Sequence, residues 1–240
     1  MKVRVKFKKY GSLRFIGHLD VMRFFQKVMR RAQIPIAFTA GYNPHMIMSF
    51  ASPLGIGLTS EGEYFDIELS EPISSSEAVR RMNEVTAEGI EVVSFRQIAE
   101  EKKMTGMAIV AAADYLVGFK NETDGAAITE KIITDFLRQQ EIVVLKQTKR
   151  SEQEVNIRPL IYRMELTKSG IYLQLAAGSV ENLKPELVLC ALYQFAGICE
   201  ASAGLSRHRL EMYADLASET EKAAGIRRLV PLDALGKDME

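Results

Sequence analysis

Two short segments near the start of the chain combine the residue types that bind and transform phosphate groups. Residues 14–20 read Arg-Phe-Ile-Gly-His-Leu-Asp, and residues 39–45 read Thr-Ala-Gly-Tyr-Asn-Pro-His. Gly17 stands directly before a helical pattern, where exposed backbone N–H groups and the positive end of the helix dipole favour an anion. The sequence therefore predicts a phosphate contact at Gly17. The further candidate contacts in these two segments are Arg14, His18, Tyr42, Asn43 and His45.

His18 and His45 are also the candidate catalytic residues. An imidazole can act as a general acid or base near neutral pH, so either side chain could assist attack by a ribose hydroxyl on a phosphodiester. The alternative for His18 is a structural role, as a helix cap or beside the apolar face of the helix. His45 follows Asn43-Pro44 in a loop, where a histidine is as often functional as structural.

Basic residues are concentrated at the start of a chain whose formal net charge is zero. Residues 1–60 contain ten Lys or Arg and a single acid, Asp20, so the remainder is acidic. A local field of one sign can attract a phosphate-rich partner even when the whole molecule is neutral. Four of these bases lie on the face of the predicted helix 18–33 that is opposite its apolar residues. We call Arg23, Lys27, Arg30 and Arg31 the basic stripe.

The bases of the first predicted strand, residues 2–9, have a second interpretation. They alternate with Val3, Val5 and Phe7, and in the expected sheet the third strand lies beside them with Tyr64, Asp66 and Glu68 facing the same way. Arg4 and Lys6 can therefore pair with those acids across the strands. In that case the basic stripe and the two loops are the better candidates for contacting phosphates.

Arg158 is the candidate in the second half of the chain. It precedes Pro159, which holds the backbone extended, and its planar guanidinium suits bidentate contact with phosphate or carboxylate. The alternative is that Arg158 braces an acid such as Glu165.

The composition bounds the class of protein. The chain has 240 residues and 47% hydrophobic residues, enough for real cores, and no run approaches the roughly 20 apolar residues that span a bilayer. We expect a cytoplasmic protein without a membrane partner. Cys190 and Cys199 are expected to be small hydrophobes, since neither a disulfide framework, a zinc site nor an iron–sulfur motif surrounds them. We expect no metal and no cofactor.

Hydrophobic periodicity predicts an α+β fold of two tandem ferredoxin-like (βαββαβ) units with antiparallel sheets. In the first unit we expect helices at 18–33 and 74–86 and strands at 2–9, 36–39, 47–51, 64–69 and 90–98. In the second we expect helices at 124–139 and 185–195 and strands at 115–119, 142–147, 160–166, 171–175 and 205–213. The expected domains are a basic N-terminal domain 1–103, a C-terminal domain 104–215 and a polar tail 216–240.

Three stretches resemble a bacterial family of radical-SAM-associated proteins of unknown function. They are Leu13–Arg23, Arg30–His45 and Ser49–Gly57, and Asn156-Ile-Arg-Pro159 resembles a second motif in which Asp is more usual at position 156. Members of that family occur as free proteins or as C-terminal extensions of radical-SAM enzymes. The resemblance implies association with a radical-SAM protein in a setting of ribosome and RNA-processing functions. It implies no catalytic residue.

These observations predict an accessory, non-catalytic RNA-binding module that acts with a radical-SAM enzyme modifying RNA or the ribosome. The RNA would be a tRNA or an rRNA. One alternative is a metal-independent endoribonuclease, by fold-level analogy with CRISPR RNA-processing endonucleases. Another is a protein–protein scaffold for the radical-SAM partner.

Overall fold

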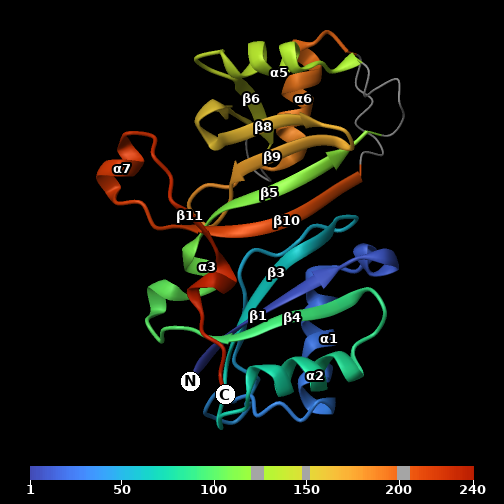
Figure 1. Ribbon diagram of the computed structural model, residues 1–240, viewed down its shortest axis with the longest axis vertical. Coiled ribbons are helices and arrows are strands. Elements are labelled where there is room, and N and C mark those ends of the chain that lie inside the picture. The colour runs from blue at the N-terminus through green and yellow to red at the C-terminus, as the bar shows by residue number, and fades with distance from the viewer. Residues whose placement is uncertain (120–126, 148–151, 199–205) are drawn as a thin grey trace. The chain divides into compact units, whose positions relative to one another are not determined.

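A computed structural model describes residues 1–119, 127–147, 152–198 and 206–240 (Figure 1). The chain forms two compact units: unit 1 comprises Met1–Ala112 and Arg209–Glu240, and unit 2 comprises Ala113–His208. The chain passes from one unit to the other within β5 (Val110–Gly118) and within β10 (Ser206–Asp215). This division differs from the expected boundaries, because the C-terminal residues return to the first unit.

Unit 1 contains a mostly antiparallel sheet with the strand order β4-β1-β3-β10, in which β2 also pairs with β3 and β11 with β10. Its strands are β1 (Lys2–Lys9), β2 (Met48–Phe50), β3 (Thr59–Glu68), β4 (Ile90–Gln97), β11 (Leu229–Pro231) and the larger part of β10. Its helices are α1 (His18–Arg31), α2 (Ser75–Val85), α3 (Gly106–Ile109) and α7 (Glu219–Ala223), with short 3-10 turns η1 (Gly11–Phe15), η2 (Lys102–Met104) and η4 (Leu232–Leu235).

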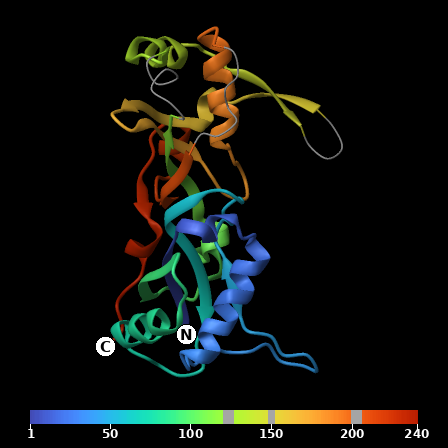
Figure 2. The ribbon, with the colours of Figure 1, turned by 90° about the vertical axis from the view of Figure 1, so that its right-hand side faces the viewer.

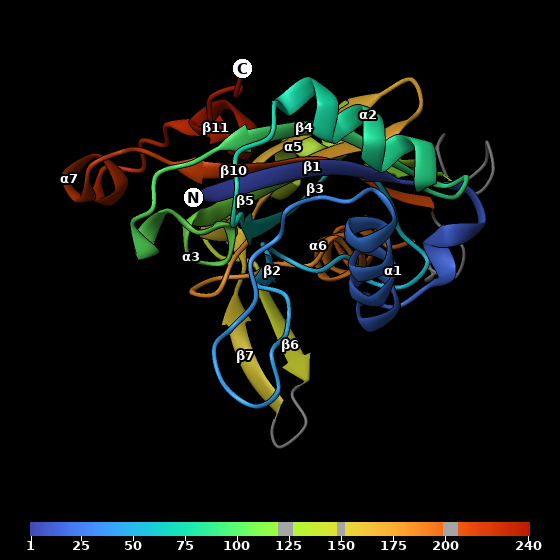
Figure 3. The ribbon, with the colours of Figure 1, turned by 90° about the horizontal axis from the view of Figure 1, so that it is seen from below.

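The alternation along β1 and the helical period of α1 produce one shared core. Phe7 of β1 packs edge-on against Phe25 of α1, with ring centroids 4.7 Å apart, and Phe50 and Phe65 complete an aromatic cluster. Helix α2 packs onto the same core through Ala78 and Met82. Figure 3 shows α1 and α2 beside the strands β1, β3 and β4. This packing leaves the opposite, basic side of α1 in solvent.

Helix α1 ends at Arg31 because the chain turns there. Gln33 adopts a positive φ of 53°, and the Ile34 N–H returns to the Met29 carbonyl at 3.0 Å, which is a common way of closing a helix. Pro35 follows and prevents continuation.

The last residues are part of unit 1 and do not form a separate tail. They form α7, β11 and η4, and Leu232 is fully buried. The Lys237 N–H donates to the Gln97 carbonyl and the Met239 N–H to the Ser75 hydroxyl, each at 2.8–2.9 Å. The composition of this stretch is polar because it docks mainly through hydrogen bonds and ion pairs.

Unit 2 has the strand order β5-β9-β8 and a separate two-stranded hairpin of β6 and β7. Its elements are α5 (Glu130–Leu137), β6 (Val143–Gln147), β7 (Glu152–Asn156), η3 (Arg158–Leu160), β8 (Ile161–Thr167), β9 (Gly170–Ala176) and α6 (Pro185–Phe195). The hairpin projects beyond the other strands of its unit (Figure 2), and its residues Val143, Val144, Leu145 and Glu154 line a pocket together with α6. Strand β7 was not predicted. The expected placement of 142–147 inside the main sheet is wrong because, within the described parts of the chain, β6 pairs only with β7.

The mixed fold with a mostly antiparallel sheet confirms the predicted class, whereas the arrangement as two tandem ferredoxin-like units is not confirmed. Residues 124–126 of the expected helix 124–139, and Cys199, lie outside the described residues. No helix in the described parts of the chain is long and apolar enough to cross a membrane.

Candidate nucleic-acid interface

The basic stripe lies on the solvent side of α1, as the helical period predicts. All four of its side chains are exposed. Arg23, whose side chain is 68% exposed, makes only a loose 3.7 Å ion pair with Asp20 one turn earlier. Within the described ranges Lys27, Arg30 and Arg31 make no ion pair. The stripe therefore keeps its positive charge available to a phosphate.

Arg4 is the opposite case, because its charge is neutralised inside the protein. It faces Asp66 directly in the β1–β3 register, and its Nε and Nη2 atoms donate to the two carboxylate oxygens at 2.8 and 3.0 Å. The Arg4 side chain has no exposed surface, and its other N–H groups donate to the Leu232 and Met104 carbonyls. The predicted cross-strand pairing of Arg4 is confirmed, and Arg4 cannot contact an external phosphate.

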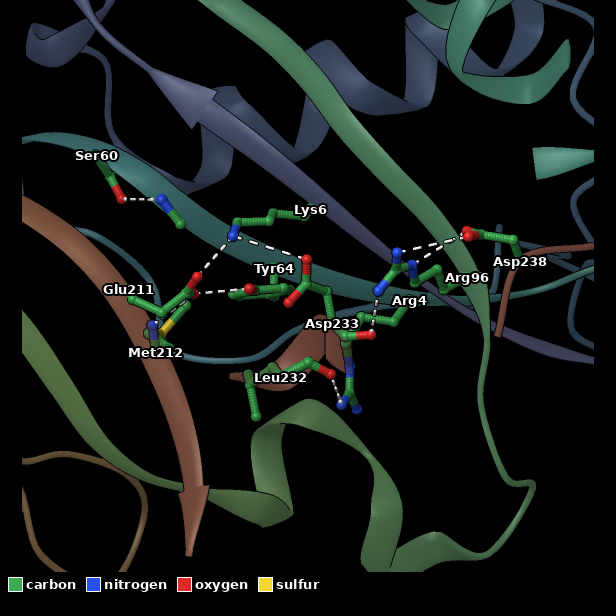
Figure 4. Close-up of polar contacts among 11 residues, drawn as sticks. Arg4, Lys6, Ser60, Tyr64, Arg96, Glu211, Met212, Leu232, Asp233 and Asp238 are labelled. Atoms are coloured by element: carbon green, nitrogen blue, oxygen red, sulfur yellow. Dashed lines mark hydrogen bonds and ion pairs between the residues drawn. The ribbon is translucent and has the colours of Figure 1, made fainter. Parts of the chain in front are cut away.

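Lys6 lies in a second polar cluster on the same face of the sheet (Figure 4). Its Nζ lies 2.6 Å from Glu211 and 3.7 Å from Asp233, and it approaches the Tyr64 ring at 5.7 Å. Tyr64 in turn donates its hydroxyl to Glu211 at 2.7 Å, and burial together with Glu211 raises the pKa of Tyr64. Both acids come from the C-terminal part of the chain, so Lys6 is neutralised by residues that the strand pattern alone did not indicate.

Lys9, at the end of β1, is 2% exposed and fixes the loop that leads into α1. Its ammonium group donates to the Ile16 carbonyl at 2.9 Å and lies 3.5 Å from the Arg14 carbonyl. Burial lowers the pKa of Lys9, while the nearby Glu63 opposes that effect. Glu63 is itself buried, which raises its pKa against the influence of Arg209, whose Nη1 lies 2.9 Å away.

Gly17 occupies the N-cap position of α1, as predicted, and no side chain caps the helix there. His18 is the first helical residue. Its half-buried ring meets the edge of Phe50 with centroids 5.0 Å apart, and burial lowers the pKa of His18. With Lys9 and Glu63 it lines a cavity of about 10 Å³, which has room for one water molecule. This environment favours the neutral imidazole and agrees with the structural alternative for His18.

The second loop presents its candidate residues to solvent. Tyr42, Asn43 and His45 are exposed, and the His45 Nδ1 lies 3.1 Å from the Thr39 hydroxyl, which also accepts from the His45 N–H. Across the described residues, no hydrogen bond or ring contact joins His45 to His18. The structure therefore does not assemble the two histidines into one acid–base pair.

Arg158 belongs to unit 2 and is occupied by backbone groups. Its Nε donates to the Leu137 carbonyl at 2.8 Å and its Nη1 to the Ile161 carbonyl at 3.3 Å. Glu165 pairs instead with Arg163, at 2.6 Å. Asn156 accepts the N–H groups of Ile142 and Arg158, each at 3.0 Å, so its side chain shapes the turn without needing a charge.

Sequence reasoning missed Phe15 and Ile56 as surface features. Their side chains are 62% and 65% exposed, and the Arg14 guanidinium lies 4.7 Å from the centre of the Phe15 ring. The available signal was that Phe15 falls between the strand and helix patterns and so belongs to neither apolar face. No group of His, Cys, Asp and Glu suited to a metal ion occurs among the residues that are described.

Comparison with known families matches residues 2–185 to a family described as an uncharacterized protein conserved in bacteria (DUF2344). Comparison with curated proteins gives no match.

Proposed function

The chain belongs to the DUF2344 family, and we propose that within it unit 1 is an RNA-binding module whose phosphate contacts are made by α1. One observation carries the proposal. The strand bases Arg4, Lys6 and Lys9 are enclosed by acids or carbonyl groups, whereas the basic stripe is exposed. Among the described residues Lys27, Arg30 and Arg31 make no ion pair and Arg23 makes only the loose one with Asp20, so the charge of the stripe remains available to an external anion.

The stripe has dimensions that suit a short length of nucleic-acid backbone. Arg23 and Arg31 are eight residues apart, which corresponds to about 12 Å along a helix. Residues 14–17 precede the N-terminal end of α1 and the exposed loop 39–45 follows its C-terminal end, and the exposed polar groups of both segments can add further contacts. Because contacts to the phosphate backbone carry no sequence information, the expected binding is electrostatic and tolerant of sequence.

The module is proposed to present RNA to a radical-SAM enzyme that modifies RNA or the ribosome. The resemblance of Leu13–Arg23 and Arg30–His45 to radical-SAM-associated proteins supports this part. The order β1-α1-β2-β3-α2-β4 supports a ferredoxin-like interpretation of unit 1, a scaffold on which many binding sites are built. An accessory role fits a site in which His18 and His45 are not paired for catalysis.

The test is binding of a labelled tRNA and a labelled rRNA fragment across a salt series. If the four stripe cations each neutralise one phosphate of a single strand, the slope of log K against log salt is about −2.8, which is roughly a 50-fold loss between 50 and 200 mM salt. Replacing all four with Ala should flatten the slope and abolish most of the affinity at low salt. The charge-matched control replaces Arg80, Arg81, Lys102 and Lys103 with Ala, and it should bind as the wild type does.

Binding that is absent at low salt, or equal in the stripe and control variants, would overturn the proposal. The same reactions also test the alternative functions. Cleavage products in the absence of metal, lost in His18→Ala or His45→Ala, would identify a ribonuclease. Co-purification with a radical-SAM protein after nuclease treatment, without RNA affinity, would identify a scaffold.

A further inference from the structure

An exposed aromatic and guanidinium surface lies at the N-terminal end of α1, beyond the basic stripe. Phe15 is 62% exposed, and the Arg14 guanidinium lies 4.7 Å from its ring centre. We call this pair the Arg14–Phe15 platform. Arg14 makes no ion pair with any described residue. Its guanidinium lies over one face of the Phe15 ring, so the outer face of each group remains for a ligand.

The platform is held in place by its backbone. The buried Lys9 ammonium binds the Ile16 and Arg14 carbonyls on one side, and the Gly57 N–H donates to the Arg14 carbonyl at 2.8 Å on the other. The bond from Gly57 brings the neighbouring residue Ile56 beside the start of α1. The Cδ1 atom of Ile56 lies 3.8 Å from the position that a Cβ atom on Gly17 would occupy. Fixed backbone positions reduce the entropy lost when a ligand binds to these side chains.

The platform directly precedes the helix that carries the basic stripe. Leu19, which is 60% exposed, occupies the first turn of α1, and Arg23 lies four residues later, about one turn on, along the same side of the helix. A ligand lying along α1 therefore meets flat apolar surface at the helix start and positive charge beyond it. A strand of unpaired nucleotides has this pair of properties, since each nucleotide offers an aromatic face and an anionic phosphate.

We infer that the platform stacks an unpaired base, so that the module selects single-stranded RNA segments. The inference rests on the proposed phosphate contacts of α1 and adds the class of RNA to them. In a duplex the base faces are covered by neighbouring base pairs, and only the phosphates would reach the stripe. Aromatic rings and guanidinium planes are the usual stacking partners of splayed bases. An acidic peptide would satisfy the cations but would leave Phe15 and the Arg14 plane without a partner.

The test compares three labelled ligands in fluorescence anisotropy: a 12-nucleotide single strand of uridine, a duplex of the same length, and a 12-unit abasic ribose-phosphate strand. Phe15→Ala should weaken binding of the uridine strand about 5- to 100-fold and leave the duplex and the abasic strand unchanged. The salt slope should stay the same, because no phosphate contact is lost. Phe15→Tyr should restore binding, and Arg14→Lys, which keeps the charge and loses the plane, should be weakened on the uridine strand alone. Phe38→Ala removes another exposed phenylalanine of unit 1 and should have no effect.

Failure of this inference is distinguishable from failure of the proposed function. If Phe15→Ala binds the uridine strand like the wild type while the stripe variant does not, the phosphate site stands and base stacking is wrong. An equal loss on all three ligands also overturns stacking, because the abasic strand has no base to lose. If the wild-type protein binds none of the three ligands, both the stacking inference and the proposed RNA-binding function are wrong.

Discussion

Replacing Arg4 tests whether the buried polar face of β1 stabilises unit 1. Arg4→Met keeps the length and apolar stem of the side chain and removes the guanidinium. Among the described residues, the variant leaves the Asp66 carboxylate, 7% exposed, with only the Gly106 N–H at 2.6 Å, and the Leu232 and Met104 carbonyls lose the Arg4 donor. Breaking one side of a buried ion pair costs about 3–5 kcal/mol, and we expect a loss of that size in the free energy of unfolding.

The assay is urea unfolding followed by far-ultraviolet circular dichroism, since the chain contains no tryptophan for fluorescence. Amide hydrogen exchange along β1 then assigns the loss to unit 1. The control is Arg96→Met. Arg96 is partly exposed, pairs with the exposed Asp238 at 3.1 Å and donates to the Asp233 carbonyl at 3.2 Å, so its replacement should cost about 1–2 kcal/mol.

A second substitution identifies the cause of the loss. If the uncompensated carboxylate destabilises Arg4→Met, adding Asp66→Asn should recover part of the stability, because the amide oxygen still accepts from Gly106 and no charge remains buried. The reasoning is refuted if Arg4→Met unfolds within about 1 kcal/mol of the wild type, or if Asp66→Asn makes it still less stable.

Two further predictions concern His18 and a turn in unit 2. Because burial lowers the pKa of His18, the unfolded chain takes up its proton near pH 6.5 before the folded chain does, so stability should fall as the pH drops through 6.5 towards the lowered value. His18→Gln should lose less stability than the wild type between pH 7.5 and 5.5, and a His18 pKa above 6.5 by NMR would contradict this. Gly170 has a φ of 147°, and a Cβ there would lie 2.0 Å from the Val117 carbonyl oxygen, so Gly170→Ala should cost on the order of 2 kcal/mol or more in urea unfolding. A Cβ on Gly55 would meet only a side-chain atom, at 3.6 Å, so Gly55→Ala should leave the free energy of unfolding nearly unchanged. Equal losses of stability in the two variants would refute the steric argument for Gly170.

The elements with strong periodicity could be predicted from the sequence. Strand β1 alternates and α1 has a clean helical period, and both appear within about two residues of the expected bounds. Ser74 caps α2 by accepting the Glu77 N–H, as the serine run before that helix predicts. Local propensity and burial agree in these segments, so the local pattern is sufficient.

The hairpin of β6 and β7 was not predictable in the same way. Val143 and Leu145 alternate like residues of a half-buried strand, yet they are 53% and 62% exposed. The alternating pattern therefore predicted that Val143 and Leu145 lie in the main sheet, whereas they lie in the separate hairpin. Strand β7 carries Glu152, Gln153 and Glu154, a polar run without the alternation by which strands are recognised.

The polar face of β1 shows most clearly where local reasoning ends. Alternation of Lys and Arg with apolar residues predicts one buried face and one solvent-exposed face, but the residues on both faces of β1 are buried or partly buried. The second covering layer includes Glu211 and η4, about two hundred residues further along the chain, and no window of sequence contains both partners. In the sequence, only the excess of acidic over basic residues after residue 60 indicated that acidic partners for the β1 cations existed.

That enclosure explains why the charge count of residues 1–60 overstates the binding surface. Of the cations on β1, Arg4, Lys6 and Lys8 are paired with Asp66, Glu211 and Glu91, while the buried Lys9 binds carbonyl groups. An external phosphate would have to displace these partners and the C-terminal segment before it reached Arg4 or Lys6. The basic stripe needs no such displacement, because α1 turns its apolar face to the core and its cations to water. Affinity for RNA should therefore depend on the four cations of α1 and be insensitive to those of β1, although β1 contains five.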